Sequence, residues 1–152
     1  MTYSLADTWT VNNRVNLMLF DALTEEQLAY TPNPRARNIA EQFAHLHNVR
    51  RTWLEAGWPA EAKTLAKLEK GAMKRGAIRE ALEASGKLVG YWIAEGERTG
   101  KMKAAKGGPA LFCGYMLAHE AHHRGQVMLH LKYAKMPVDR DLSFAIWEWE
   151  KI

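Results

Sequence analysis

The chain has 152 residues, of which 47% are hydrophobic and 25% are charged, and its formal net charge is +4. This composition excludes a chain that is disordered throughout, and it is typical of one globular domain over residues 1–152. The chain has a single cysteine, Cys113, so it cannot form an internal disulfide. No apolar run reaches the roughly 18 residues of a membrane span, and the start of the chain lacks the pattern of a signal peptide, so we expect a cytoplasmic protein that is not bound to a membrane.

Hydrophobic residues recur at helical spacing along the chain, and the alternation typical of strands is missing, so we predict an all-α fold. A first helix is expected over residues 5–23. Ser4 and Asp7 form a capping pair at its start. Two asparagines, Asn13 and Asn16, lie on its apolar face, where they would either line a pocket or fix the register of the helices.

A second helix is expected over residues 38–56, because Asn38 and Glu41 have the spacing of a capping box. A short helix over residues 60–70 should follow, with lysines three or four residues apart: Lys63, Lys67, Lys70 and Lys74. This spacing is typical of the solvated face of a helix, and no aromatic residue is interleaved to stack on bases. Nucleic acid is therefore not an expected partner.

The apolar pattern from Ile78 to Ile93 predicts a third long helix. Gly86 and Gly90 lie inside it, and each glycine costs a helix roughly 1 kcal/mol relative to alanine. We therefore expect both to permit close contact with a neighbouring helix.

A fourth helix is expected over residues 110–135, ended by Pro137. The segment 139–152 is too apolar for a free terminus and should dock on the bundle as an additional C-terminal segment. Arg124 and Gly125 on the less apolar side of the fourth helix, together with this segment, favour a homodimer.

All six histidines lie on two predicted helices: His45 and His47 on the second, and His119, His122, His123 and His130 on the fourth. A buried imidazole without a partner costs a few kcal/mol, so these side chains should form hydrogen bonds or bind a metal. His119 and His123 are one helical turn apart, about 6 Å along the axis, and can hold one divalent ion. Helical periodicity leaves open whether His45 or His47 supplies the third ligand.

Residues 119–123 also fit the zinc-peptidase pattern H-E-x-x-H, in which Glu120 would be the general base. A peptidase of this type needs a strand to bind an extended peptide, and no strand is predicted. We therefore keep a metallopeptidase as a second alternative only, and we expect Glu120 at the surface as a partner of Arg124 at i+4.

Three segments, NIAEQFAHLHNVRRTWL, LAHEAHHRGQVMLHL and IWEWEKI, together resemble the DinB family of YfiT-like metalloenzymes. The resemblance implies a four-helix bundle in up-down-down-up order and a divalent metal bound by His45, His119 and His123. His47 and His122 would then have supporting or packing roles. Gln126, one turn beyond His123, could line the pocket or fix helix register as the asparagines would.

The resemblance also implies an activity similar to that of thiol-dependent transferases and isomerases. We therefore expect a metal-dependent thiol S-transferase or hydrolase, in which a low-molecular-weight thiol or water is activated toward a small-molecule electrophile. Three histidine ligands leave a coordination position open for that chemistry. Imidazole donors suit zinc or nickel and also iron. The main alternative is a non-catalytic helical bundle for metal binding or protein interaction, and the resemblance also favours a homodimer.

Overall fold

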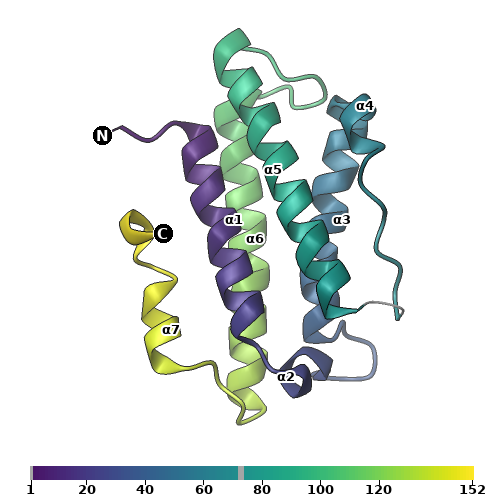
Figure 1. Ribbon diagram of the computed structural model, residues 1–152, viewed down its shortest axis with the longest axis vertical. Coiled ribbons are helices and arrows are strands. Elements are labelled where there is room, and N and C mark those ends of the chain that lie inside the picture. The colour runs from purple at the N-terminus through teal and green to yellow at the C-terminus, as the bar shows by residue number, and fades with distance from the viewer. Residues whose placement is uncertain (1, 72–73) are drawn as a thin grey trace.

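The computed structural model describes residues 2–71 and 74–152, which form helices and loops and contain no strand. The bundle has four long helices: α1 (Leu5–Ala22), α3 (Ile39–Gly57), α5 (Arg75–Thr99) and α6 (Gly108–Tyr133). In Figure 1, α1 and α6 run in one direction and α3 and α5 in the other. The predicted all-α fold and the up-down-down-up order are therefore confirmed.

Capping residues set the beginnings of α1 and α3 as the sequence predicts. The Ser4 hydroxyl accepts from the Asp7 amide, and the Asn38 side chain accepts from the Glu41 amide, each within a complete capping box. A third capping box opens the short helix α2 (Glu25–Ala29). These local hydrogen bonds satisfy amide groups that have no partner inside the helix.

The C-terminal segment contains α7 (Arg140–Ala145) and a 3-10 turn, η1 (Trp149–Lys151), and it packs on the bundle through Leu142 and Ile146. Ile146 is buried, and Arg14 of α1 donates a hydrogen bond to the carbonyl of Ile152 at 2.8 Å. Trp147, by contrast, is 75% exposed and does not contribute to the core. Across the described residues, no helix is both long enough and apolar enough to cross a membrane.

The predicted lysine-rich helix over residues 60–70 is wrong. Helix α4 (Pro59–Ala62) is short, and residues 63–70, which we call the strap, have no helical structure. Their backbone groups bond to side chains of α3: Asn48 to both the amide and the carbonyl of Leu68, Arg51 to the carbonyl of Leu65, and His47 to the carbonyl of Ala66. Because these groups already have side-chain partners, they do not form the hydrogen bonds of a helix.

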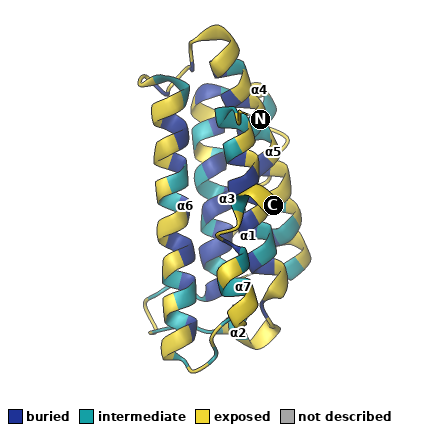
Figure 2. Ribbon diagram, turned by 90° about the vertical axis from the view of Figure 1, so that its left-hand side faces the viewer, coloured by how far each residue is buried: buried dark blue, intermediate teal, exposed yellow. Residues whose placement is uncertain are grey.

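Helices α1 and α5 are in close contact at the predicted glycines. A β-carbon at Gly86 would overlap the Asn13 side chain, and one at Gly90 would lie 3.3 Å from the Trp9 ring. The Trp9 indole also donates a hydrogen bond to the carbonyl of Gly86 at 2.7 Å. Buried residues lie on the inner faces of the helices (Figure 2), and the glycines let two of these faces approach closely.

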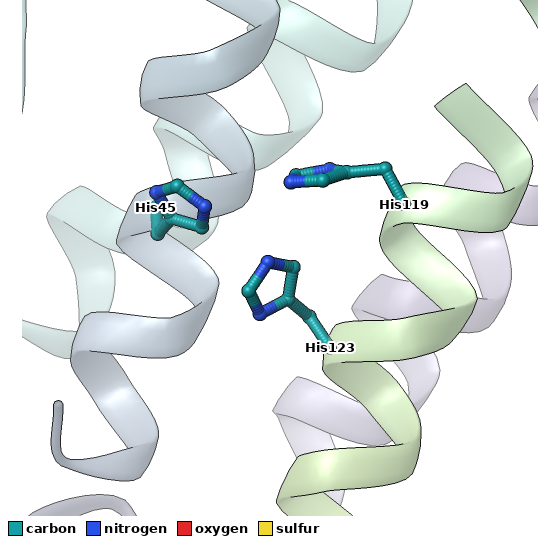
Figure 3. A group of neighbouring side chains, drawn as sticks. All are labelled: His45, His119 and His123. Atoms are coloured by element: carbon teal, nitrogen blue, oxygen red, sulfur yellow. The ribbon is translucent and has the colours of Figure 1, made fainter. Parts of the chain in front are cut away.

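Helix α6 does not bury the face on which most of its apolar side chains lie. At 100° per residue, one apolar stripe is centred on His119 and should face the core, yet four of its residues are 48–76% exposed: Leu111, Tyr115, Leu129 and Tyr133. The buried side is instead formed by Phe112, Cys113, Met116, Glu120, His123, Arg124, Val127 and Leu131. His119 and His123 consequently lie near the boundary of the buried side and face α3 (Figure 3).

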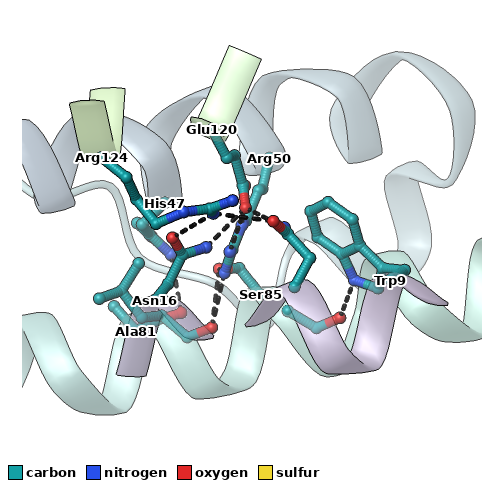
Figure 4. A network of polar contacts seen from close by, with 11 residues as sticks. Trp9, Asn16, His47, Arg50, Ala81, Ser85, Glu120 and Arg124 are labelled. Atoms are coloured by element: carbon teal, nitrogen blue, oxygen red, sulfur yellow. Dashed lines mark hydrogen bonds and ion pairs between the residues drawn. The ribbon is translucent and has the colours of Figure 1, made fainter. Parts of the chain in front are cut away.

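A buried carboxylate explains this orientation (Figure 4). Glu120 has no exposed surface, and its carboxylate accepts hydrogen bonds from Asn12 at 2.6 Å, from Asn16 at 2.7 Å and from Arg50 at 2.6 and 3.0 Å. The expected surface position of Glu120 is therefore wrong. Its ion-pair partner is Arg50, which lies 70 residues away in sequence.

Two guanidinium groups complete this network. Arg50 of α3 also donates to the carbonyl of Leu82 on α5 at 2.8 Å. Arg124 donates to the side-chain oxygens of Asn12 at 2.7 Å and of Asn16 at 2.8 Å, so each asparagine bridges Arg124 and Glu120. The network thus links all four long helices and fixes the rotation of α6.

We expect Glu120→Gln to destabilise the fold, because it leaves the buried guanidinium of Arg50 without a counterion. Loss of one partner from a buried ion pair costs about 3–5 kcal/mol, so the free energy of unfolding measured with urea should fall by that amount. The matched control is Glu83→Gln, which breaks an exposed pair with Arg79 and should cost less than about 1 kcal/mol. Equal losses for the two variants would contradict the structural role of Glu120.

Candidate metal centre

Three histidines from two helices come together between α3 and α6. His45, His119 and His123 each offer a ring nitrogen, and these three atoms lie within 4.8 Å of one another. The ring centroids are 5.4 Å apart for His45 and His119, and 4.7 Å apart for the two pairs that include His123. Figure 3 shows the rings pointing toward one another. The sequence pattern left His45 and His47 as alternatives, and His45 is the one that lies beside the α6 pair.

Gln42 fixes the orientation of one imidazole. Its side-chain oxygen lies 2.8 Å from Nδ1 of His123, and because an amide oxygen can only accept, Nδ1 carries the proton. Nε2 of His123 then has the free lone pair that a metal needs. Gln42 in turn donates to Gln126 at 3.4 Å. Gln42 is not among the residues predicted from the sequence, although it lies one helical turn before His45 on the same face.

The environment keeps the three imidazoles neutral. Burial, followed by the charge of Arg37, lowers the pKa of His45 to about 4. Burial and the neighbouring histidines lower the pKa of His123 to about 4 as well. Burial also lowers the pKa of His119. At neutral pH these side chains are therefore in the unprotonated form that binds metal ions.

The donor set fits a divalent ion. Zinc binds imidazole nitrogens at about 2.0–2.1 Å, so tetrahedral ligands lie about 3.4 Å apart. The nitrogen atoms of the cluster, all within 4.8 Å, need only small side-chain rotations to reach that spacing. Among the described residues no carboxylate or thiol joins the cluster, because Glu120 belongs to the buried network. A bound ion would keep an open position.

Three other residues that the sequence predicted near the site, His47, His122 and Asn16, are not part of the three-histidine cluster. His47 is buried, and its two ring nitrogens lie 2.9 and 2.8 Å from the carbonyls of Ala81 and Ala66, so it connects the strap to α5. His122 is exposed, with its ring 5.2 Å from that of His123. Asn16 belongs to the Glu120 network and does not contact the histidine cluster.

Two cavities lie close to residues of the cluster, and one of them includes His45 in its wall. The first, the basic cavity, has a volume of about 640 Å³ and is lined by His45 and Gln126 together with charged side chains of the strap and of the turn before α3. The second, the apolar cavity, has a volume of about 390 Å³, and Trp53, Phe112 and Tyr115 contribute to its wall. Tyr115 also stacks on His119 with a centroid distance of 6.2 Å. The basic cavity thus adjoins His45, whereas the apolar cavity is linked to the cluster through the contact between Tyr115 and His119.

One of three comparisons with known proteins identifies the family of the chain. No curated protein and no solved structure gives a significant match to the chain. A family model does match residues 9–127, a range that contains the three histidines and Gln42 but not the IWEWEKI ending. Because this match extends over more than half of the sequence and the helices have the expected order, the chain belongs to the DinB superfamily.

Proposed function

We propose that the protein is a divalent-metal-dependent enzyme that activates a thiol or water toward a small electrophile, with His45, His119 and His123 as the metal ligands. The observation that carries this proposal is the convergence of three neutral imidazoles without a fourth ligand among the described residues. A divalent ion at such a site lowers the pKa of a thiol or water in its open position. Membership of the DinB superfamily is consistent with metal binding.

The chain's own residues would prepare the site for this chemistry. Gln42 holds the proton of His123 on Nδ1, so that Nε2 stays available as a ligand. Trp53, Phe112 and Tyr115 form an apolar wall near His119, which suits the apolar part of an electrophile and excludes water from it. The imidazole donors support zinc or nickel, and also iron, as the bound metal.

The alternatives receive less support. A peptidase of the H-E-x-x-H type would need Glu120 as a base that contacts substrate, yet this carboxylate is fully buried and accepts four hydrogen bonds. A non-catalytic metal-binding bundle needs neither an open coordination position nor the two cavities beside the histidines. The geometry therefore favours the enzyme.

We expect protein purified without chelator to contain one divalent ion per chain by elemental analysis. His119→Ala and His123→Ala should lose this ion, because two imidazole ligands at most would remain. Lys132→Ala is the matched control, since Lys132 is an exposed residue of the same helix. Undiminished metal content in both histidine variants would reject the ligand assignment.

A thiol-transfer assay tests the proposed enzymatic activity. Metal-loaded protein is incubated with a panel of cellular thiols and chlorodinitrobenzene, so that sulfur forms a bond to the aromatic carbon, chloride leaves and the thiol proton passes to solvent. We expect conjugate to form faster than the background reaction with at least one thiol, and His119→Ala to return the rate to background while Lys132→Ala does not. Equal rates for the wild type and His119→Ala across the panel would contradict thiol transfer, and hydrolysis would then be the reaction to test.

We also propose that the protein forms a homodimer through the outer face of α6. Tyr115, Leu129 and Tyr133 are 48–76% exposed on this face, and the small exposed residues Gly114, Ala118 and Gly125 beside them would let a partner helix approach closely. Arg124, which the sequence suggested for this interface, is buried in the Glu120 network and is not available for it. An exposed apolar stripe of this kind is typical of protein interfaces.

Light scattering at tens of micromolar should therefore give the mass of a dimer. Tyr133→Glu places a charge on the apolar stripe and should shift the protein to monomer. Tyr91→Glu changes an equally large exposed tyrosine on α5 and should leave the dimer intact. A monomeric mass for the unmodified protein would refute the interface.

A further inference from the structure

We propose that the basic cavity beside His45 is a subsite for an anionic group, a carboxylate or a phosphate, on a small molecule that binds at the three histidines. The inference rests on the proposed function, because it assigns the chemical class of the cosubstrate. It depends on the charges that line the cavity, on how these charges are held, and on their position next to the candidate metal ligands.

Cations outnumber anions in the wall of the basic cavity. It is lined by four basic side chains, Arg35, Arg37, Lys67 and Lys70, and by two acidic ones, Glu41 and Glu69. Glu69 pairs with Lys67 at 3.2 Å, and Glu41 accepts a hydrogen bond from the amide of Asn38 in the capping box. Arg35, Arg37 and Lys70 therefore have no carboxylate partner among the described residues. An anionic ligand would supply the missing countercharge.

Hydrogen bonds hold the two backbone segments that carry these cations. Arg35 and Arg37 lie on the turn before α3, where the Asn33 side chain accepts hydrogen bonds from the amides of Arg35 at 3.0 Å and of Ala36 at 3.1 Å. Lys67 lies on the strap, whose backbone bonds to α3 on both sides of it, through Ala66 and Leu68. Lys67 and Lys70 therefore line a cavity beside α3 and do not lie on the solvated face of a helix.

The strap is anchored by groups that are costly to detach. His47, which contacts both the strap and α5, is 1% exposed, and the Asn48 side chain makes two hydrogen bonds to Leu68. Opening the strap would leave these polar groups without protein partners. The cations on this side of the cavity are consequently presented by an ordered segment.

The cavity adjoins the candidate metal ligands directly. His45 forms part of its wall, as do Gln42 and Gln126, the amides next to His123. The charge of Arg37 also acts on both His45 and His123, where it contributes to their lowered pKa values. A volume of about 640 Å³ suits a small molecule whose anionic end meets the arginines while another part reaches the histidines.

The two cavities would orient such a molecule. The basic cavity lies on the His45 side of the cluster, whereas Tyr115 of the apolar cavity stacks on His119. An anionic cosubstrate would thus enter beside His45, and an apolar electrophile beside His119. The two reactants would meet at the three histidines without competing for one binding surface.

The test is calorimetric titration of the purified protein with succinate, with inorganic phosphate and with succinamide, the neutral analogue of succinate. We expect at least one anion to bind and succinamide to bind at least about ten-fold more weakly. Arg37→Gln should weaken anion binding about ten-fold, the loss expected for one hydrogen bond to a charged group. Lys101→Gln removes the same charge from an exposed site outside the cavity and should stay within about two-fold of the wild type. The tighter of the two anions identifies the source as carboxylate or phosphate.

Three outcomes would overturn the subsite: no binding of either anion, equal binding of succinate and succinamide, or equal anion affinity in the wild type, Arg37→Gln and Arg35→Gln. The last result would place the anion on a metal ion or on the general surface. Circular dichroism checks that both variants fold, as expected for two exposed side chains. Anion binding is measured without turnover. If the protein binds anions but forms no conjugate, the anion subsite is supported and only the proposed thiol transfer is contradicted.

Discussion

The structure depends on the ion pair between Glu120 and Arg50 in the centre of the bundle. Burying these charges is costly, and it is tolerated because four hydrogen bonds surround one carboxylate. Successive residues on a helix point about 100° apart, so directing Glu120 into the bundle sets the direction of His119. The ion pair therefore determines that the α6 histidines lie at the edge of the buried face, where they meet His45 instead of the apolar core.

The same constraint explains why α6 departs from ordinary amphipathicity. Its buried side contains Glu120 and Arg124, and its outer side contains Leu129 and Tyr133. The asparagines of α1 make this arrangement possible, because each donates to the carboxylate and accepts from Arg124. A polar interior of this kind specifies one rotation of the helix, since any other would leave charged groups without partners.

Local sequence signals were sufficient for most of the fold, and the candidate site was only partly predictable. Capping boxes and helical periodicity placed α1, α3 and α6 within two residues of their observed ends, whereas α5 begins three residues before Ile78 and continues six residues beyond Ile93. The pair His119 and His123 followed from helical spacing, but the choice of His45 needed the family resemblance. Glu120 and Arg124 resembled a surface i+4 pair because the partner of Glu120, Arg50, comes from a distant helix. The strap was missed because its lysine spacing matches that of a solvated helix, while the α3 side chains that prevent the helix lie about 20 residues earlier.

Helix α3 connects the metal centre, the core and the cavity through one polar run. Between residues 45 and 51, successive side chains have different partners: His45 faces the α6 histidines, His47 and Asn48 hold the strap, Arg50 binds Glu120, and Arg51 bonds to Leu65. A buried helix tolerates so many polar groups only because each one has its own partner. The positions of the histidines, the carboxylate network and the basic cavity are thus set by the same two turns of helix. Because Leu65 of the strap is buried in the core, a shift of the strap relative to α3 would disturb the cavity and the core together.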